Sequence, residues 1–128
     1  MGKSICIIVR KPPYGSMDAA EAIRHMNGAL SAGLDTRVVL MGDGVYVGAT
    51  NQDAGSAGWT SLAEALEQAL SSGAKLREGG HNRASAHAHA PSLAERGLAA
   101  ERLVKGVQLV SDAEMAELLA QSESVLVF

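Results

Sequence analysis

Residues 91–98 read Pro-Ser-Leu-Ala-Glu-Arg-Gly-Leu and directly follow Ala-His-Ala-His-Ala at residues 86–90. Ser92 and Glu95 have the spacing of a capping box, which predicts the start of a short helix, and Gly97 is placed to end it. A helix of this kind should follow its strand closely. We therefore place a strand at Ala84–Ala90, immediately before it.

This strand has one alternative placement. Alanine and histidine are poor strand formers, so the local sequence does not require a strand at Ala84–Ala90. The strand could instead lie near Ala74–Leu76, which would leave the histidines in a long loop. The first placement makes Arg77–Arg83 an extra loop, and we prefer it because it keeps strand and helix together.

The remaining strands are marked by apolar runs. Ser4–Val9 is a continuous apolar run rich in β-branched residues, which is typical of a strand buried on both faces. The final run, Ser124–Phe128, has the same character. Both lack polar alternation, so we expect both to be deeply buried. Thr36–Met41 and Val107–Val110 are the other predicted strands.

Helices are predicted between these strands from capping pairs and apolar stripes. One stripe consists of Ile23, Met26, Leu30 and Leu34, and another of Met115, Leu118 and Leu119. Glycines are expected to end two helices, at Gly33 and Gly73. The predicted capping pairs are Asp18 with Glu21, Ser61 with Glu64, and Ser111 with Glu114.

Strands that alternate with helices predict a parallel sheet covered on both faces. A chain of 128 residues is the size of one domain. The expected fold is therefore a single three-layer α/β/α domain over residues 1–128, with a mainly parallel sheet of about five strands.

Composition excludes several classes of partner. Aromatic residues make up only 3% of the chain and the formal net charge is −3, which argues against nucleic-acid binding by stacking or through a basic surface. Cys6 is the only cysteine, so no internal disulfide can form and we expect a reducing, cytoplasmic location. The apolar run at residues 5–9 is too short to be a signal segment or to span a membrane.

Several motifs together resemble the DsrE/DsrF/TusC-type sulfur-relay family (DsrEFH). They are Ser-Leu-x-x-Arg-Gly-Leu at residues 92–98, Gly-Asp-Gly-Val at 42–45 and Ser-Val-Leu-Val-Phe at 124–128. The resemblance implies a small α/β domain that assembles as a trimer or hexamer, often with related but unlike subunits. In active members a cysteine three residues before the serine carries persulfide sulfur, and His89 occupies that position here.

This substitution decides the functional expectation, because imidazole cannot form a persulfide. The resemblance implies a non-catalytic subunit that acts by assembly in intracellular sulfur transfer; if it were active, it would be sulfurtransferase-like. We expect a homo-oligomer, or a hetero-oligomer with related subunits, and no cofactor. His89 itself is the candidate for an acid–base or hydrogen-bonding role. Cys6 is expected to be a buried apolar residue rather than a sulfur carrier.

A different class of function is a metal- or ligand-binding module. His87 and His89 are spaced i, i+2 and share one face of a strand, and His81 could add a third ligand. No further ligand lies at a supporting spacing, so we expect no specific metal binding.

Two loops add further candidates. Tyr14, Ser16 and Asp43 are expected at the carboxyl edge of the sheet, where open α/β folds bind ligands. Residues 45–59 are predicted as a loop that could include a short turn. Its apolar members are expected to be exposed and could cover a partner: Val45, Tyr46, Val47 and Trp59.

Overall fold

The computed structural model describes residues 3–50, 61–76 and 84–128. Five strands form one sheet in the order β4-β3-β2-β1-β5, and every neighbouring pair is parallel. Their bounds are β1 Ser4–Val9, β2 Asp35–Leu40, β3 Ala84–His89, β4 Val107–Val110 and β5 Ser124–Val127. The helices are α1 Asp18–Ser31, α2 Leu62–Leu76, α3 Ala90–Glu95 and α4 Asp112–Gln121, with 3-10 turns η1 at Gly42–Gly48 and η3 at Ala100–Arg102.

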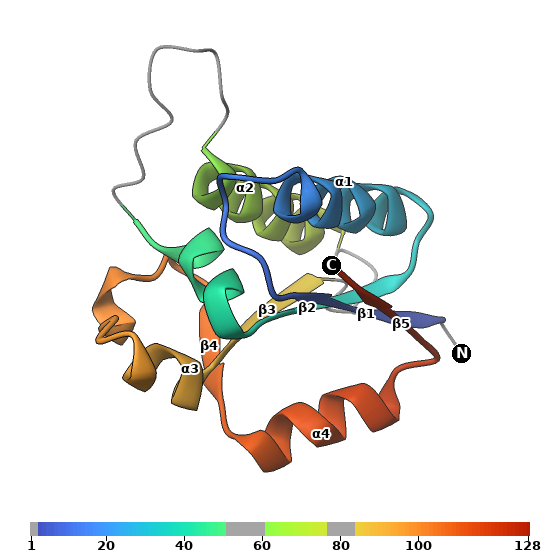
Figure 1. Ribbon diagram of the computed structural model, residues 1–128. Helices are drawn as coiled ribbons and strands as arrows, with labels where there is room; N and C mark the ends of the chain where they lie inside the picture. Colours follow the sequence, from blue (N-terminus) through green and yellow to red (C-terminus); the bar gives the residue numbers. More distant parts are fainter. Residues whose placement is uncertain (1–2, 51–60, 77–83) are drawn as a thin grey trace.

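The predicted three-layer α/β architecture is confirmed. Helices α1 and α2 lie over one face of the sheet, and α4 lies under the other (Figure 1). The preferred placement of the third strand is also confirmed, because β3 occupies Ala84–His89 and leads directly into α3. The extra loop expected at residues 77–83 lies outside the described residues.

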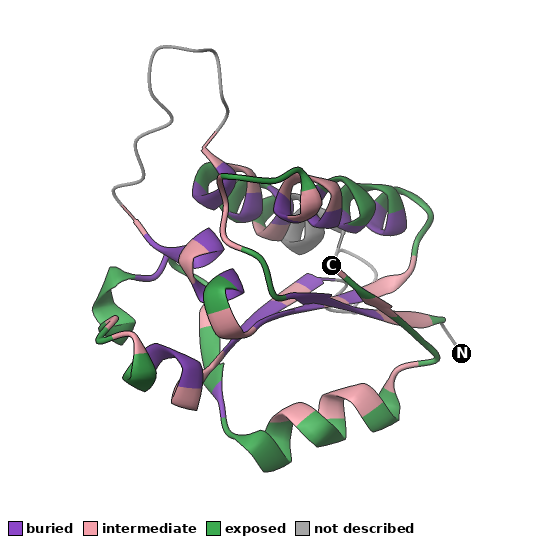
Figure 2. Ribbon diagram, viewed as in Figure 1, coloured by how far each residue is buried: buried purple, intermediate pink, exposed green. Residues whose placement is uncertain are grey.

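The two faces of the sheet are buried to different extents. The larger core lies under α1 and α2, where Ile7, Val38 and Met26 are almost fully buried. Among the described residues, the apolar cluster under α4 has only Cys6, Ile8 and Val39 as buried members. No residue of α4 is fully buried, as Figure 2 shows by the absence of purple on that helix. The α4 layer is therefore the more weakly packed one.

The expected burial of the last strand is wrong. β1 is deeply buried, but β5 is an edge strand in which Val125 is 42% exposed and Val127 is 54% exposed. The apolar run predicted a strand correctly but could not give its position in the sheet. The last helical stripe behaves in the same way: Met115, Leu118 and Leu119 are only partly buried.

The predicted helix ends are partly confirmed. Ser111 and Glu114 form a reciprocal capping box at the start of α4, and Ser61 Oγ accepts the Glu64 N–H at 3.4 Å. Two other capping predictions are wrong. α1 follows Met17 and α3 follows His89, and neither residue makes a side-chain cap, so Asp18 and Ser92 lie inside their helices. Gly73 does not end α2, which continues to Leu76.

The segment after β2 also differs from expectation. Gly42–Gly48 forms the 3-10 turn η1, in which Val45 and Val47 are fully buried, so their expected exposure is wrong. Tyr46 is half-buried, and Trp59 lies outside the described residues. Gly97 does follow α3 in the left-handed conformation, with φ of 62°, as a helix-ending glycine should. Among the described residues, no helix has the length and apolar character needed to cross a membrane.

Candidate functional site at the end of the third strand

His89 lies at the carboxyl end of β3, at the point where strand and helix meet. α3 begins at the next residue, and Pro91 lies in its first turn, where a missing N–H costs no helical hydrogen bond. No loop separates β3 from α3. The position of His89 is therefore fixed by two regular elements rather than by a loop.

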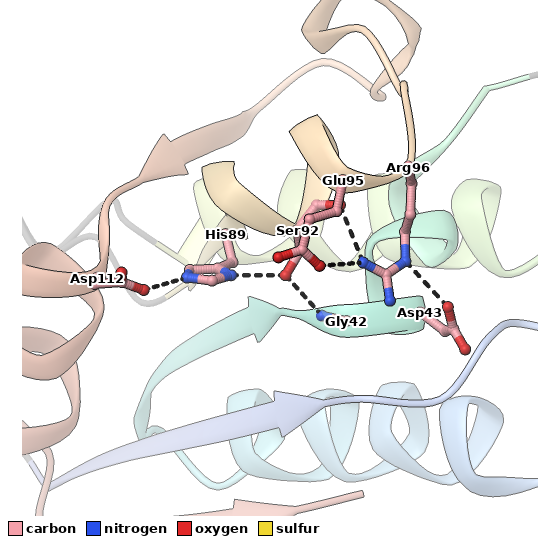
Figure 3. Close-up of polar contacts among 7 residues, drawn as sticks. All are labelled: Gly42, Asp43, His89, Ser92, Glu95, Arg96 and Asp112. Atoms are coloured by element: carbon pink, nitrogen blue, oxygen red, sulfur yellow. Dashed lines mark hydrogen bonds and ion pairs between the residues drawn. The ribbon is translucent and has the colours of Figure 1, made fainter.

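Both ring nitrogens of His89 are engaged (Figure 3). Nδ1 is 2.6 Å from Ser92 Oγ, and Nε2 is 2.5 Å from Asp112 Oδ1. Ser92 Oγ also accepts the backbone N–H of Gly42 at 2.9 Å. With a neutral imidazole, Nε2–H donates to the carboxylate and the serine hydroxyl donates to Nδ1. Donors and acceptors therefore match along the row of contacts formed by Asp112, His89, Ser92 and Gly42. The row joins the β3–α3 junction to the turn after β2 and to the start of α4.

Serine, histidine and aspartate in one row are also the parts of a hydrolase triad. Here, however, Ser92 is only 5% exposed, and its oxygen is already occupied by the Gly42 N–H. A nucleophile must be accessible to its substrate, and the buried Ser92 hydroxyl is not. The arrangement is suited to holding the imidazole in one orientation.

Arg96 makes a second connection between the same elements. Its Nε donates to Asp43 Oδ1 at 3.0 Å, and its Nη1 donates to the carbonyl of Ser92 at 3.1 Å. Asp43, predicted at the edge of a pocket, is thus paired with the arginine of the Ser-Leu-x-x-Arg-Gly-Leu motif. The turn after β2 and helix α3 are held together by this pair and by the Gly42–Ser92 bond.

The other two predicted edge residues are not part of this row. Ser16 Oγ accepts the Asp18 N–H at 3.4 Å, just before α1. Tyr14 is half-buried, and its hydroxyl has no hydrogen-bond partner among the described residues. Conversely, sequence reasoning did not identify Ser92, Arg96 and Asp112 as neighbours of His89 and Asp43. The motif contains Ser92 and Arg96, but nothing in the sequence marks Asp112 beyond its place at a helix start.

His87 lies on the same face of β3 as His89 but has different partners. Its Nε2 is 3.0 Å from Ser85 Oγ, and the residue is 7% exposed. His81, the third predicted metal ligand, lies outside the described residues. Within the described part of the chain, no three His, Cys, Asp or Glu side chains are grouped to hold a metal ion.

Burial lowers the pKa of His87, and the positive charge of Arg37 acts in the same direction, while Glu114 opposes them. The unfolded chain therefore binds more protons than the folded one as the pH falls below about 6.5, the ordinary histidine value. Above that pH, we expect the titration of His87 to leave the free energy of unfolding unchanged. Below it, the free energy of unfolding should decrease as the pH falls toward the lower folded-state pKa of His87. Urea unfolding between roughly pH 7.5 and 5.5 measures this effect.

The variant His87→Phe should remove that part of the pH dependence, whereas His25→Gln, at an exposed position on α1, should retain it. Two carboxylates do not interfere with this measurement. The Arg24 hydrogen bond lowers the pKa of Glu21, and the Ser111 backbone hydrogen bond lowers the pKa of Glu114. Both therefore affect the pH dependence of unfolding only below their ordinary value of 4.5. Equal pH slopes for the parent and His87→Phe would contradict the assignment.

Comparison with known proteins places the chain in a family. The model of the DsrE/DsrF-like family matches residues 3–128. The chain is 27% identical over 124 residues to an uncharacterised protein of Methanopyrus kandleri, covering 97% of this chain and 93% of that protein. It is also 27% identical over 122 residues to an uncharacterised protein of Methanocaldococcus jannaschii, covering 95% and 96%.

A solved structure shows the same fold. The crystal structure of the YchN protein from E. coli superposes with a TM-score of 0.81 at 23% sequence identity, covering 98% of this chain and 99% of that one. At this identity the likeness concerns the fold alone.

Proposed function

Because the chain belongs to the DsrE/DsrF-like family, we propose that it is a sulfur-relay-type subunit that carries no sulfur itself and acts through assembly. The observation that carries this proposal is the position of His89 and the bonding of its ring. By the family resemblance it stands where a carrier cysteine would stand, and both of its nitrogens are held, by Ser92 and Asp112. β3 leads directly into α3, and by the resemblance an imidazole held by two contacts stands in place of the thiol.

The only thiol of the chain supports the same proposal. Persulfide formation requires a thiolate that attacks the sulfane sulfur of a donor. Cys6 is fully buried in β1, and that burial raises the pKa of its thiol, against the opposing influence of Arg37 and Ser122. Cys6 is therefore both inaccessible and mostly protonated at neutral pH.

Assembly is supported by apolar residues at the two edges of the sheet. Val125 and Val127 on β5 and Leu109 on β4 are more than 40% exposed. Edge strands with exposed apolar side chains favour covering by another chain. The partner in this proposal is a second copy or a related subunit, and the trimeric or hexameric stoichiometry comes from the family resemblance.

We expect light scattering on the purified chain to give a mass several times that of the 13.2 kDa monomer. Val127→Lys should shift the population toward smaller species, because it places a charge in the proposed contact. Ser124→Lys is a matched control that adds the same charge to β5 without removing apolar surface. A monomeric parent chain at micromolar concentration would contradict the assembly proposal.

The histidines of β3 support a second, different candidate, a metal site, because His87 and His89 project from one strand face. We expect no stoichiometric zinc binding at tens of micromolar by isothermal titration, since a metal ion would have to displace Asp112 or Ser92 from His89. Binding of one zinc ion per chain, weakening below about pH 6.5 and abolished in His87→Ala/His89→Ala, would establish the metal function instead.

A further inference from the structure

The outer edge of β5 carries none of the features that usually prevent an edge strand from pairing. Among the described strands, β5 pairs only with β1 and lies at the edge of the sheet (Figure 1). Natural edge strands are commonly blocked by a charge, a proline or a bulge. Residues 124–127 read Ser-Val-Leu-Val, and their register with β1 is continuous. This edge is therefore open to another strand.

The backbone of β5 shows which residues are available for pairing. The Phe128 N–H donates to the carbonyl of Ile8, and the Phe128 carbonyl accepts the N–H of Arg10, both at 2.8 Å. The N–H and C=O groups of successive residues in a strand point to opposite sides. Those of Val125 and Val127 therefore point away from β1, toward the outside of the sheet.

The same two residues expose their side chains. Val125 and Val127 are in register with Cys6 and Ile8, which are buried under α4. The valines therefore lie on the α4 face of the sheet, but α4 does not cover them, and they are 42% and 54% exposed. Leu126 projects from the other face and is partly buried. Apolar side chains and outward-pointing backbone groups thus belong to the same residues.

We propose that a second copy of this chain pairs its β5 strand antiparallel with this one, across a two-fold axis at Leu126. Val125 of each copy then exchanges backbone hydrogen bonds with Val127 of the other, and their side chains meet on the α4 face. The two Leu126 residues face each other at a position without backbone hydrogen bonds. Such a contact joins two trimers into a hexamer, so this inference rests on the assembly proposed above.

Charge favours the antiparallel arrangement. Glu123 is exposed just before β5, whereas Arg10 and Lys11 are exposed beside the other end of the strand. Antiparallel pairing places Glu123 of one copy about two strand spacings, roughly 10 Å between Cα atoms, from Arg10 of the other. Two long side chains can bridge that distance, and the two-fold axis makes the contact twice. Parallel pairing in register would instead bring the two Glu123 carboxylates together.

The test is disulfide trapping in a Cys6→Ala background. With Leu126→Cys, the two cysteines face each other across the axis with Cα atoms about 4.5 Å apart, within the range of a disulfide. Val125→Cys is the matched control: Val125 is more exposed than Leu126, but its two copies lie beyond the roughly 7 Å that a disulfide spans. Under mild oxidation with glutathione disulfide, Leu126→Cys should form a covalent dimer at least about tenfold faster than Val125→Cys.

The outcomes separate this contact from assembly in general. Equal or faster trapping of Val125→Cys would overturn the register. A Leu126→Cys chain that is oligomeric by light scattering but forms no disulfide would overturn the β5 contact and leave the assembly proposal standing. A monomeric parent would overturn both. If Leu126→Cys does not fold, the double variant Val125→Cys/Val127→Cys decides, because its cysteines lie opposite each other across the axis and must form the covalent dimer.

Discussion

Replacing Gly44 with alanine is expected to destabilise the chain by at least about 3 kcal/mol, with a fall in Tm on the order of 10 °C. Gly44 is buried in η1, and a Cβ atom there would lie 1.9 Å from the carbonyl oxygen of Val9 and 2.6 Å from its carbonyl carbon. Both are backbone atoms of β1, and the same oxygen accepts the Met41 N–H at 3.0 Å. Because no flexible side chain can yield here, η1 must move away from the sheet.

Gly28→Ala is the matched control. Gly28 lies inside α1, and a Cβ atom at this position meets nothing within 4 Å. Because alanine favours a helix more than glycine does, this variant should gain about 0.5–1 kcal/mol. Urea unfolding measures both variants. A Gly44→Ala chain within about 1 kcal/mol of the parent would contradict the close contact between η1 and β1.

The close approach of η1 explains why sequence reasoning misread this segment. Residues 42–48 are rich in glycine, which is typical of an exposed loop. The glycines instead allow the backbone to lie against β1 and turn Val45 and Val47 into the core. The local pattern contained the apolar residues but not the element against which they pack.

Strand identity was predictable from the sequence, and strand position was not. The apolar runs gave β1 and β5 almost to the residue, and the motif helix placed β3 despite its poor strand formers. The exposure of β5 follows from its place at the sheet edge, which depends on the order of strands. A run of apolar residues has the same appearance in a central strand and in an edge strand that another chain could cover.

The candidate site was predictable only in part. His89 was identified from the family resemblance, and Asp43 from the turn after the second strand. Their partners come from distant parts of the chain: Asp112 lies 23 residues from His89, and Arg96 lies 53 residues from Asp43. Such pairs are created by the sheet, which brings the carboxyl ends of β2 and β3 together. No local spacing in the sequence predicts them.

The chain is expected to gain a sulfur-carrying function from one substitution. His89→Cys, in a Cys6→Ala background, restores a thiol at the position of the family's carrier cysteine and opens the space of the imidazole ring. A donor persulfide should then transfer its terminal sulfur: the introduced thiolate forms the new S–S bond, and the donor leaves as a thiolate. We expect one labile sulfur per chain, against none for Cys6→Ala alone.

The variant also tests the site itself. Ser92 and Asp112 lose their bonds to the imidazole, so a matched His89→Ser chain in the same background controls for that loss without supplying a thiol. Loading of His89→Ser would show that sulfur is held elsewhere. Failure of folded His89→Cys to load would show that the end of β3 is not accessible to a donor, and would argue against its correspondence to the family's carrier position.

The most direct measurement is intact mass spectrometry of the unmodified chain after incubation with a persulfide donor, with and without a reducing agent. We expect no reducible gain of sulfur, because His89 cannot form a persulfide and Cys6 is fully buried. Rapid gain of one reducible sulfur atom per chain, abolished by Cys6→Ser, would contradict it and would make Cys6 the carrier.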